Sequence, residues 1–508
     1  MLRGHGMRGH ASSREAEAGR RGLTPTLRRG AIISAASLVF VQVVSFGQTL
    51  VLARILTPTE VGIFYGGTVL TSLLVTFSEG GIRNALVQRQ DDLEAAANTA
   101  FLASLASGTL LSLLALAAAP LVGLLLHSQE AGLVAAVSSG SLLLFALTYV
   151  PDSLMQRRFD FRQRMIVQPG VTLTFAVASV ALCLGGLGVW GLVIASYASQ
   201  GVWVAASWSL ARWRPRRGYA TFALWRQMAR YGFPLVLGSL MDRAKEAIDT
   251  AVVGSLFSPA AVGQYRYGRR LGLLPGTVII EVGSYVLFPA FSRAATDMAR
   301  LRRAYLRALR VLWMAAMPVV ALVLALGSAA TVLLLGEPWR EAGDMFTSLA
   351  GSGAGVAMAA VGYESIKGHG RTSLLYSINA VGFVLGVVSL IALAVPLGLV
   401  GVGASLSVTS LVSGALSLVL AGRLIGVTLR AHLHVMVAPL VAAAVATVIW
   451  WVLERQLIHA DRADAGVGLL LLTGEAIGCV ATYLVVLACV SPHSLRSFRA
   501  ALFPAQTP

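Results

Sequence analysis

Long apolar segments dominate the chain, and short polar connections separate them. The first segment covers residues 31–52, and its length matches the roughly 20 apolar residues with which an α-helix crosses a bilayer. Thirteen more segments of this kind follow, so the pattern predicts an all-α polytopic membrane protein with about 14 transmembrane helices. We place the later segments at 61–77, 97–116, 133–150, 166–187, 189–210, 231–256, 271–291, 311–335, 345–366, 374–395, 400–421, 435–453 and 468–490.

The amino-acid composition also indicates a membrane protein. Of the 508 residues, 56% are hydrophobic and 12% are charged. That leaves too little polar surface to cover a soluble globular protein. A formal net charge of +17 would suit a nucleic-acid-binding protein, but the arginines are spread between apolar runs and do not gather on one predicted face. We therefore expect no nucleic-acid partner.

Arginine is distributed unevenly between alternate connections. With the N-terminus inside, and apart from the three arginines at 266–270 that are assigned to the start of the next segment, the outer connections contain only Arg54, Arg340, Arg455 and Arg462. Because cytoplasmic loops are enriched in Lys and Arg, this asymmetry predicts a bacterial inner-membrane protein with both termini in the cytoplasm. An inner arginine can also serve simply as an anchor near anionic membrane lipids. The inner arginines are Arg157, Arg158, Arg162, Arg164, Arg212, Arg214, Arg216, Arg217, Arg226, Arg230, Arg293, Arg300, Arg302, Arg303, Arg307 and Arg310.

Two short motifs occur twice. LTPTEVGIF at 56–64 matches FSPAAVGQY at 257–265, and LGVWG at 187–191 matches LGLVG at 397–401, with offsets of 201 and 210 residues. Proline and glycine are what any tight turn requires, so each match alone is weak. Together they indicate an internal duplication.

The duplication predicts two six-helix lobes related by a pseudo-two-fold axis. Units with an even number of spans enter the membrane from the same side, as in transporters that expose a central site alternately to either face. The predicted organisation is a disordered basic tail at 1–30, lobes at 31–211 and 231–425 joined by a cytoplasmic linker at 212–230, two accessory helices at 426–492, and a tail at 493–508.

Five segments together resemble the polysaccharide transporter branch, with its Wzx-type flippases, of the multidrug/oligosaccharidyl-lipid/polysaccharide exporter superfamily. They are LARILTPTEVG (52–62), GGIRNALVQR (80–89), QRRFDFRQR (156–164), YGFPLVLGSLMDRAKEAIDTAVVGSLFSPAAVGQY (231–265) and VLFPAFSR (286–293). The resemblance covers nearly the whole chain. It implies a substrate of the undecaprenyl-pyrophosphate-oligosaccharide type, moved without covalent chemistry, and partners among polysaccharide polymerases and chain-length or export machinery.

The segment 231–256 contains a dense group of ionisable residues. At helical spacing, one half of this segment presents Asp242, Arg243, Lys245, Glu246 and Asp249. Ionisable groups at membrane depth are costly unless they meet a partner or water. These side chains therefore either pair locally, Arg243 with Glu246 and Lys245 with Asp249, or line a central cavity as substrate or coupling-ion ligands.

A second group lies directly before residue 271, at the start of the next helix. Arg266, Arg269 and Arg270 have the i, i+3, i+4 spacing of one helical face, and no acidic residue is near them in the sequence. Arginine offers forked donors that suit a pyrophosphate better than lysine does. These three are the leading candidates for headgroup ligands, and an interfacial anchor role is the alternative.

Three further residues complete the candidate set. Arg54 lies on the side where arginine is disfavoured, which makes it a possible substrate ligand. Glu79 and Glu364 end their predicted segments and could line the cavity; Glu364 could instead pair with Lys367.

Other function classes lack support. The chain shows no plausible catalytic nucleophile set, ATP-binding motif or cofactor signature, and its closest histidine pair, His432 and His434, has no partner suited to a metal site. The outer connections 337–344 and 454–464 are too short for a polymerase or glycosyltransferase domain, and we expect them to be solvated turns. A multidrug or cation efflux carrier of the same superfamily is the remaining alternative, but it would favour an acidic cavity.

Overall fold

The computed structural model describes residues 36–79, 81–89, 91–158, 163–216, 220–294 and 297–492, and the regular secondary structure of this part of the chain is helical, without strands. The predicted tails 1–30 and 493–508 lie outside the described residues. The prediction of an all-α, multi-pass membrane protein is confirmed.

Ten described helices are long and apolar enough to cross a membrane, or eleven if a bent helix pair, Glu337–Ser348 with Gly351–Gly368, counts as one span. The predicted total of about 14 stays a prediction. It is reached if the charged helices α9 (Phe222–Leu256) and α10 (Pro259–Ala294) also cross, and if α14 (Ser373–Ile425) crosses twice. Within α14, Gly398 breaks the helix with φ 62° and ψ −142°, two residues after Pro396. The break falls in the predicted LGLVG turn.

The chain divides into two compact units. Unit 1 comprises residues 1–55, 70–120 and 133–240, and a core around Leu86, Phe101 and Leu154 holds part of it together. Buried Asp152 accepts hydrogen bonds from Trp203 Nε1 (3.0 Å) and Ser207 Oγ (2.7 Å). Its helices are Ala36–Ile55, α3 (Ile82–Gln88), α6 (Ser141–Arg157), α7 (Gln168–Leu184), α8 (Gly188–Ala211), most of α4 (Leu93–Leu125), and parts of α2 (Pro58–Glu79), α5 (Gln129–Ser138) and α9.

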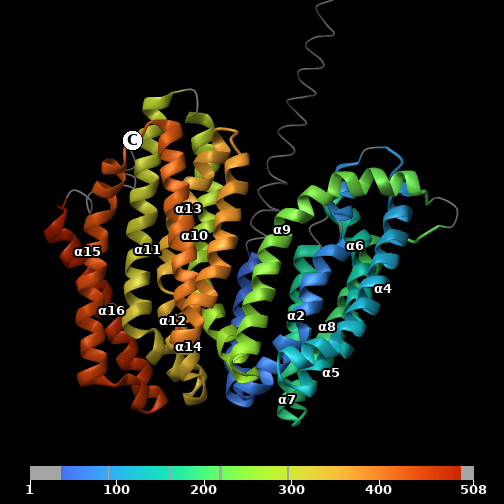
Figure 1. Ribbon diagram of the computed structural model, residues 1–508, viewed down its shortest axis with the longest axis horizontal. Helices are drawn as coiled ribbons and strands as arrows, with labels where there is room; N and C mark the ends of the chain where they lie inside the picture. Colours follow the sequence, from blue (N-terminus) through green and yellow to red (C-terminus); the bar gives the residue numbers. More distant parts are fainter. Residues whose placement is uncertain are drawn as a thin grey trace, which may run out of the picture. The chain divides into compact units, whose positions relative to one another are not determined.

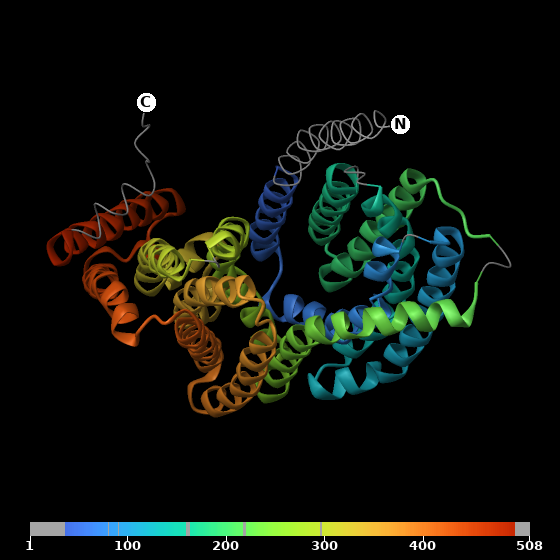
Figure 2. The same ribbon diagram turned by 90° about the horizontal axis from the view of Figure 1, so that it is seen from above.

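Unit 2 comprises residues 56–69, 121–132 and 241–508. Its helices gather into a bundle in Figure 1, and Figure 2 shows α16 at the edge of that bundle. Tyr305, Trp313 and Met317 on one face of α11 fill the core, and Asp297 caps α11 by accepting from the N–H groups of Ala299 and Arg300. Besides α10, α14 and the remaining parts of α2, α4, α5 and α9, the helices are α11 (Met298–Leu335), α12 (Arg340–Ser348), α13 (Gly351–Gly368), α15 (Leu429–Leu453) and α16 (Ala465–Val490).

The repeated PxxVG turns meet one another inside unit 2. Pro58 and Pro259 each begin a helix, α2 and α10, where proline's missing N–H has no consequence. A Cβ on Gly62 would lie 1.7 Å from the carbonyl oxygen of Pro259, and one on Gly263 would lie 2.0 Å from that of Pro58. The contact is therefore reciprocal, and the two turns lie side by side within unit 2. A pseudo-two-fold relation between complete lobes stays a prediction.

Candidate functional site

The predicted ionisable residues converge where α9 and α10 pack as an antiparallel hairpin. Asp249 on α9 is 1% exposed and receives Lys245 Nζ at 3.1 Å. The hydroxyl of Tyr265 on α10 donates to Asp249 Oδ2 at 3.3 Å, and Arg269 donates to the same hydroxyl at 2.9 Å. A continuous network of charge and hydrogen bonds therefore links the two helices.

Glu246 is the second centre of this network. Its carboxylate pairs with Arg266, and the guanidinium groups of Arg269 and Arg243 each lie 3.7 Å away. The expectation that the α10 arginines lack nearby acids was therefore wrong for Arg266 and Arg269. The acid is distant in the sequence, and the hairpin brings it opposite α10. Both predicted local pairs on α9 are present, and one of them is shared with α10.

Tyrosine rings complete the surroundings of the arginines. The Arg266 guanidinium carbon lies 4.5 Å from the ring centroid of Tyr65 on α2, and that of Arg269 lies 5.9 Å from the ring of Tyr265. Such cation–π contacts fix the plane of a guanidinium group. Sequence reasoning missed both tyrosines, although Tyr265 ends the second copy of the repeated motif and Tyr65 directly follows the first copy.

A cavity of about 260 Å³ opens beside this network. Three positive side chains and one negative side chain contribute to its wall, so the formal charges leave an excess of two positive charges. We call Arg266, Arg269 and Arg270, with Glu246, the basic cluster. The cavity is lined by Glu246, Arg266, Arg269, Arg270, Leu273 and Leu274.

The remaining predicted residues lie elsewhere or are not described. Arg54 is exposed on the helix Ala36–Ile55 of unit 1. Glu364 on α13 pairs with Lys367 of its own helix at 2.8 Å, so the predicted pairing is present. The side chains of Glu79 and Asp242 lie outside the described residues.

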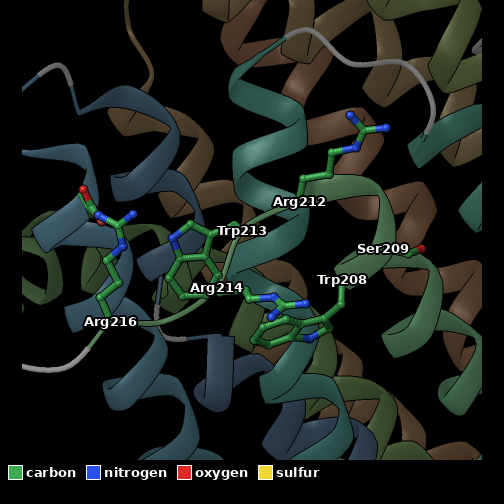
Figure 3. Close-up of a pocket in the computed structure, with 7 residues that line it drawn as sticks. Trp208, Ser209, Arg212, Trp213, Arg214 and Arg216 are labelled. Atoms are coloured by element: carbon green, nitrogen blue, oxygen red, sulfur yellow. The ribbon is translucent and has the colours of Figure 1, made fainter.

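A second basic cavity, of about 650 Å³, lies in unit 1 on the loop that follows α8 (Figure 3). We call Arg212, Arg214 and Arg216 the basic loop. Arg216 pairs with Glu94 of α4 at 2.7 Å, and these side chains are 67% and 49% exposed. Figure 3 shows the side chain of Arg214 reaching toward Trp208, and Trp208 Nε1 donates to the carbonyl of Leu147. Solvent and tryptophan thus surround these charges.

The comparisons with known proteins now decide the family. A model described as "Polysaccharide biosynthesis protein" matches residues 51–344, which include the basic cluster. The chain belongs to this family. The resemblance to the polysaccharide transporter branch is thereby confirmed.

Curated relatives of this polysaccharide biosynthesis protein are themselves named for transport or polysaccharide assembly. The succinoglycan biosynthesis transport protein ExoT of Rhizobium meliloti (strain 1021) is 26% identical over 64% of this chain and 66% of its own length. The lipopolysaccharide biosynthesis protein WzxC of Escherichia coli (strain K12) is 21% identical over 61% of this chain and 64% of its own length. The chain thus spans slightly less than two thirds of these relatives.

Solved structures show that the fold of this family member is that of a known transporter class. The inward closed conformation of the lipid II flippase MurJ superposes with a TM-score of 0.72 at 12% identity, over 92% of this chain and 100% of that one. An inward-facing multidrug resistance MATE family transporter of the MOP superfamily superposes with a TM-score of 0.61 at 15% identity, over 77% and 98%. At these identities the likeness concerns the fold alone.

Proposed function

We propose that this protein is a flippase that moves undecaprenyl-pyrophosphate-linked oligosaccharide units across the cytoplasmic membrane for surface polysaccharide or exopolysaccharide biosynthesis. The observation that carries the proposal is the charge of the cavity beside α9 and α10, where three arginines face one glutamate. A pyrophosphate that joins a polyprenol to a sugar carries an ionised oxygen on each phosphate. The excess of positive charge on the cavity wall therefore matches the charge of this headgroup.

The geometry of the arginines suits the same ligand. The side chains of Arg266 and Arg269 are 36% and 20% exposed, so part of their surface is already removed from water. Forked guanidinium donors in such a setting bind phosphate oxygens through two parallel hydrogen bonds. Glu246 holds both forks in place, and a phosphate entering the cavity would compete with this carboxylate. On binding, phosphate would therefore replace the Glu246 carboxylate as the partner of these arginines. Without substrate, the carboxylate keeps Arg266 and Arg269 paired.

The family supports a role in polysaccharide biosynthesis. Relatives named for succinoglycan and lipopolysaccharide biosynthesis indicate an oligosaccharide cargo. In the proposed mechanism two lobes rock about the paired PxxVG turns and expose the cavity alternately. Both termini are proposed to be cytoplasmic, with membrane lipids, a polysaccharide polymerase and export machinery as partners.

A cation efflux carrier on the same fold is the rival function. A cavity selective for cationic drugs would need an excess of negative charge, because an unpaired cation would meet repulsion from arginine. The basic cluster has the opposite balance, so the geometry favours an anionic substrate.

The test is polysaccharide export in a strain that lacks the native gene, normalised to the amount of this protein in the membrane. We expect Arg266→Ala and Arg269→Ala to lower export at least about tenfold, which corresponds to the loss of one charge-assisted contact of roughly 1.4 kcal/mol or more. Arg266→Lys should restore export only in part, because lysine pairs with Glu246 but loses the fork. Arg266→Glu should abolish export.

A matched control comes from the basic loop. Arg214→Ala removes the same charge from an exposed site and should leave export near wild type. Full export by the Arg266, Arg269, Arg270 triple alanine variant, at normal protein level, would overturn the headgroup assignment. Full rescue by Arg266→Lys would assign the cluster an anchoring role, and resistance to cationic drugs without export would establish the rival function.

A further inference from the structure

A second ionisable site lies away from the basic cluster, in helix α16. Glu475 is the only charged residue between Ala465 and Val490, and it is 3% exposed. Both of its carboxylate oxygens are buried, and no hydrogen-bond donor reaches either of them from the described part of the chain. A carboxylate buried in this manner is expensive, because its hydration is lost and nothing replaces it.

The carboxyl group of Glu475 interacts electrostatically with another carboxyl group, that of Glu454. Glu454 begins a π-helical turn, Glu454–Ile458, that continues α15, and it is 5% exposed. The N–H of Ala460 donates to its two oxygens at 3.1 and 3.2 Å. The expectation that 454–464 is a solvated turn was therefore wrong at its first residue, because the π-turn directs this side chain inward.

Within the described residues, the two long helices packed against α16 place no cation beside the pair. On α11, the segment 311–335 contains no ionisable residue, and on α15 the charged and titratable groups Arg430, His432 and His434 begin the helix, ~30 Å from Glu454 at 1.5 Å per residue. The neighbouring titratable groups on α16 itself are the Cys479 thiol and the Tyr483 hydroxyl, and Tyr483 donates to the carbonyl of Met314.

A polar cavity of about 430 Å³ lies next to Glu454. Arg340 on its wall is held by Glu337 at 2.7 Å and by Asp461 at 2.8 Å, and the Arg455 guanidinium lies over the ring of Trp451. Arg340 and Arg455 thus interact with other side chains. The cavity gives water a route to Glu454. The remaining ionisable side chains on its wall are Asp344, His459 and Arg462.

Two ionised carboxylates in contact repel each other strongly when no described cation pairs with either of them and they are removed from bulk water, so one of them is expected to stay neutral. We propose that Glu454 and Glu475 form a proton-binding site, in which the pair shares one proton and exchanges it with water in the adjacent cavity. A shared proton also supplies the donor that the oxygens of Glu475 otherwise lack. The ligand of this site is a proton, and the site is separate from the proposed headgroup cavity.

The position of the pair gives proton release a structural consequence. α16 packs against α15 and α11, and Cys479, Tyr483 and Leu487 of α16 contribute to the main core of unit 2. Loss of the proton would place two negative charges at this helix interface. The packing of α16 on α11 would then weaken, so the accessory helices would respond to the pH on the cavity side.

Infrared difference spectroscopy of the full chain in lipid bilayers tests the proposal, since a protonated carboxyl group has its own C=O stretching band. At neutral pH the wild-type minus Glu475→Gln spectrum should contain one such band. The band should shift in D₂O, because the proton exchanges with cavity water. Glu341→Gln, a change at an exposed glutamate of α12, should give no band.

A second variant keeps the proposal testable if Glu475→Gln assembles poorly. A shared proton couples the two groups, so Glu454→Gln should shift or remove the same band, and alkaline pH should remove it from the wild type. A wild-type spectrum that is unchanged in both variants would overturn the proposal. So would a band that persists in D₂O without a shift, because the proton would then be sealed from the cavity.

Discussion

Arg266 and Arg269 lie partly buried between α9 and α10, whereas Arg216 of the basic loop is 67% exposed. In the basic cluster, the carboxylate of Glu246 is approached by the guanidinium groups of Arg266 and Arg269, each of which also lies near a tyrosine ring. In the basic loop, one exposed pair joins Arg216 to Glu94, and tryptophan indoles line the remaining wall. Arginines in the basic cluster thus share one partly buried carboxylate. Arginines in the basic loop are exposed to solvent beside aromatic rings, and one of them forms an exposed ion pair.

The difference separates a ligand site from an anchor. Desolvated charges attract an oppositely charged ligand strongly because the local dielectric is low. They also require a counter-ion when no ligand is bound. Exposed arginines need no counter-ion, and they are screened by salt within about 10 Å under ordinary conditions. A cluster that combines burial with an excess of positive charge is therefore suited to bind an anion, whereas the loop is suited to rest near anionic lipid headgroups.

The largest expected effect comes from removing the counter-ion in each region. Glu246→Ala should destabilise the folded protein by about 1 to 3 kcal/mol, because two partly buried guanidinium groups lose their shared carboxylate. Glu94→Ala should cost less than about 1 kcal/mol, because its pair is exposed. Thermal unfolding of the purified variants in one detergent measures both. Equal shifts in the unfolding midpoint would show that burial does not distinguish the two regions.

The second effect tests aromatic packing in the basic loop. Trp213 lies edge-on to Phe101 at 5.7 Å between ring centroids and 5.8 Å from Trp208. Trp213→Ala should therefore destabilise unit 1 by about 1 to 3 kcal/mol, since each aromatic pair contributes roughly 0.5–1.5 kcal/mol beyond its buried area. Trp213→Phe should recover most of this loss.

Protease sensitivity of the loop after α8 measures the effect of Trp213→Ala directly, with Arg214→Ala as the control that changes charge and keeps the rings. If Arg214→Ala loosens the loop as much as Trp213→Ala does, charge and not aromatic packing holds it.

The sequence was sufficient for features that depend on neighbours along the chain. The PxxVG turns begin α2 and α10, the LGLVG motif contains the break at Gly398, and Lys245 pairs with Asp249 one helical turn away. Each follows from local backbone preference or from helical spacing, so one segment contains all the necessary information.

Features that depend on packing between helices could not be predicted in this way. The pairing of Glu246 with Arg266 spans a hairpin, and its register depends on how α9 and α10 pack. The contact between Glu454 and Glu475 requires α15 to end in a π-turn, and no residue type in that segment specifies such a turn. The only signal for Glu475 was one acid inside an otherwise apolar span, which is a reason to suspect a function at membrane depth.

The smallest effect is the response of the two regions to salt, and it sharpens the comparison with only the two counter-ion variants, Glu246→Ala and Glu94→Ala. The Debye length falls from about 10 Å at 0.1 M to about 3 Å at 1 M, so high salt should erase the few tenths of a kcal/mol that the Glu94–Arg216 pair contributes. The stability difference between wild type and Glu94→Ala should therefore vanish at high salt. The difference between wild type and Glu246→Ala should persist, because the side chains around Glu246 are partly shielded from mobile ions. The thermal midpoints of the three proteins, measured at low and high sodium chloride, give both differences. If the Glu246 difference also vanishes, ions and water reach the basic cluster freely, and its arginines would then bind a phosphate no better than those of the basic loop.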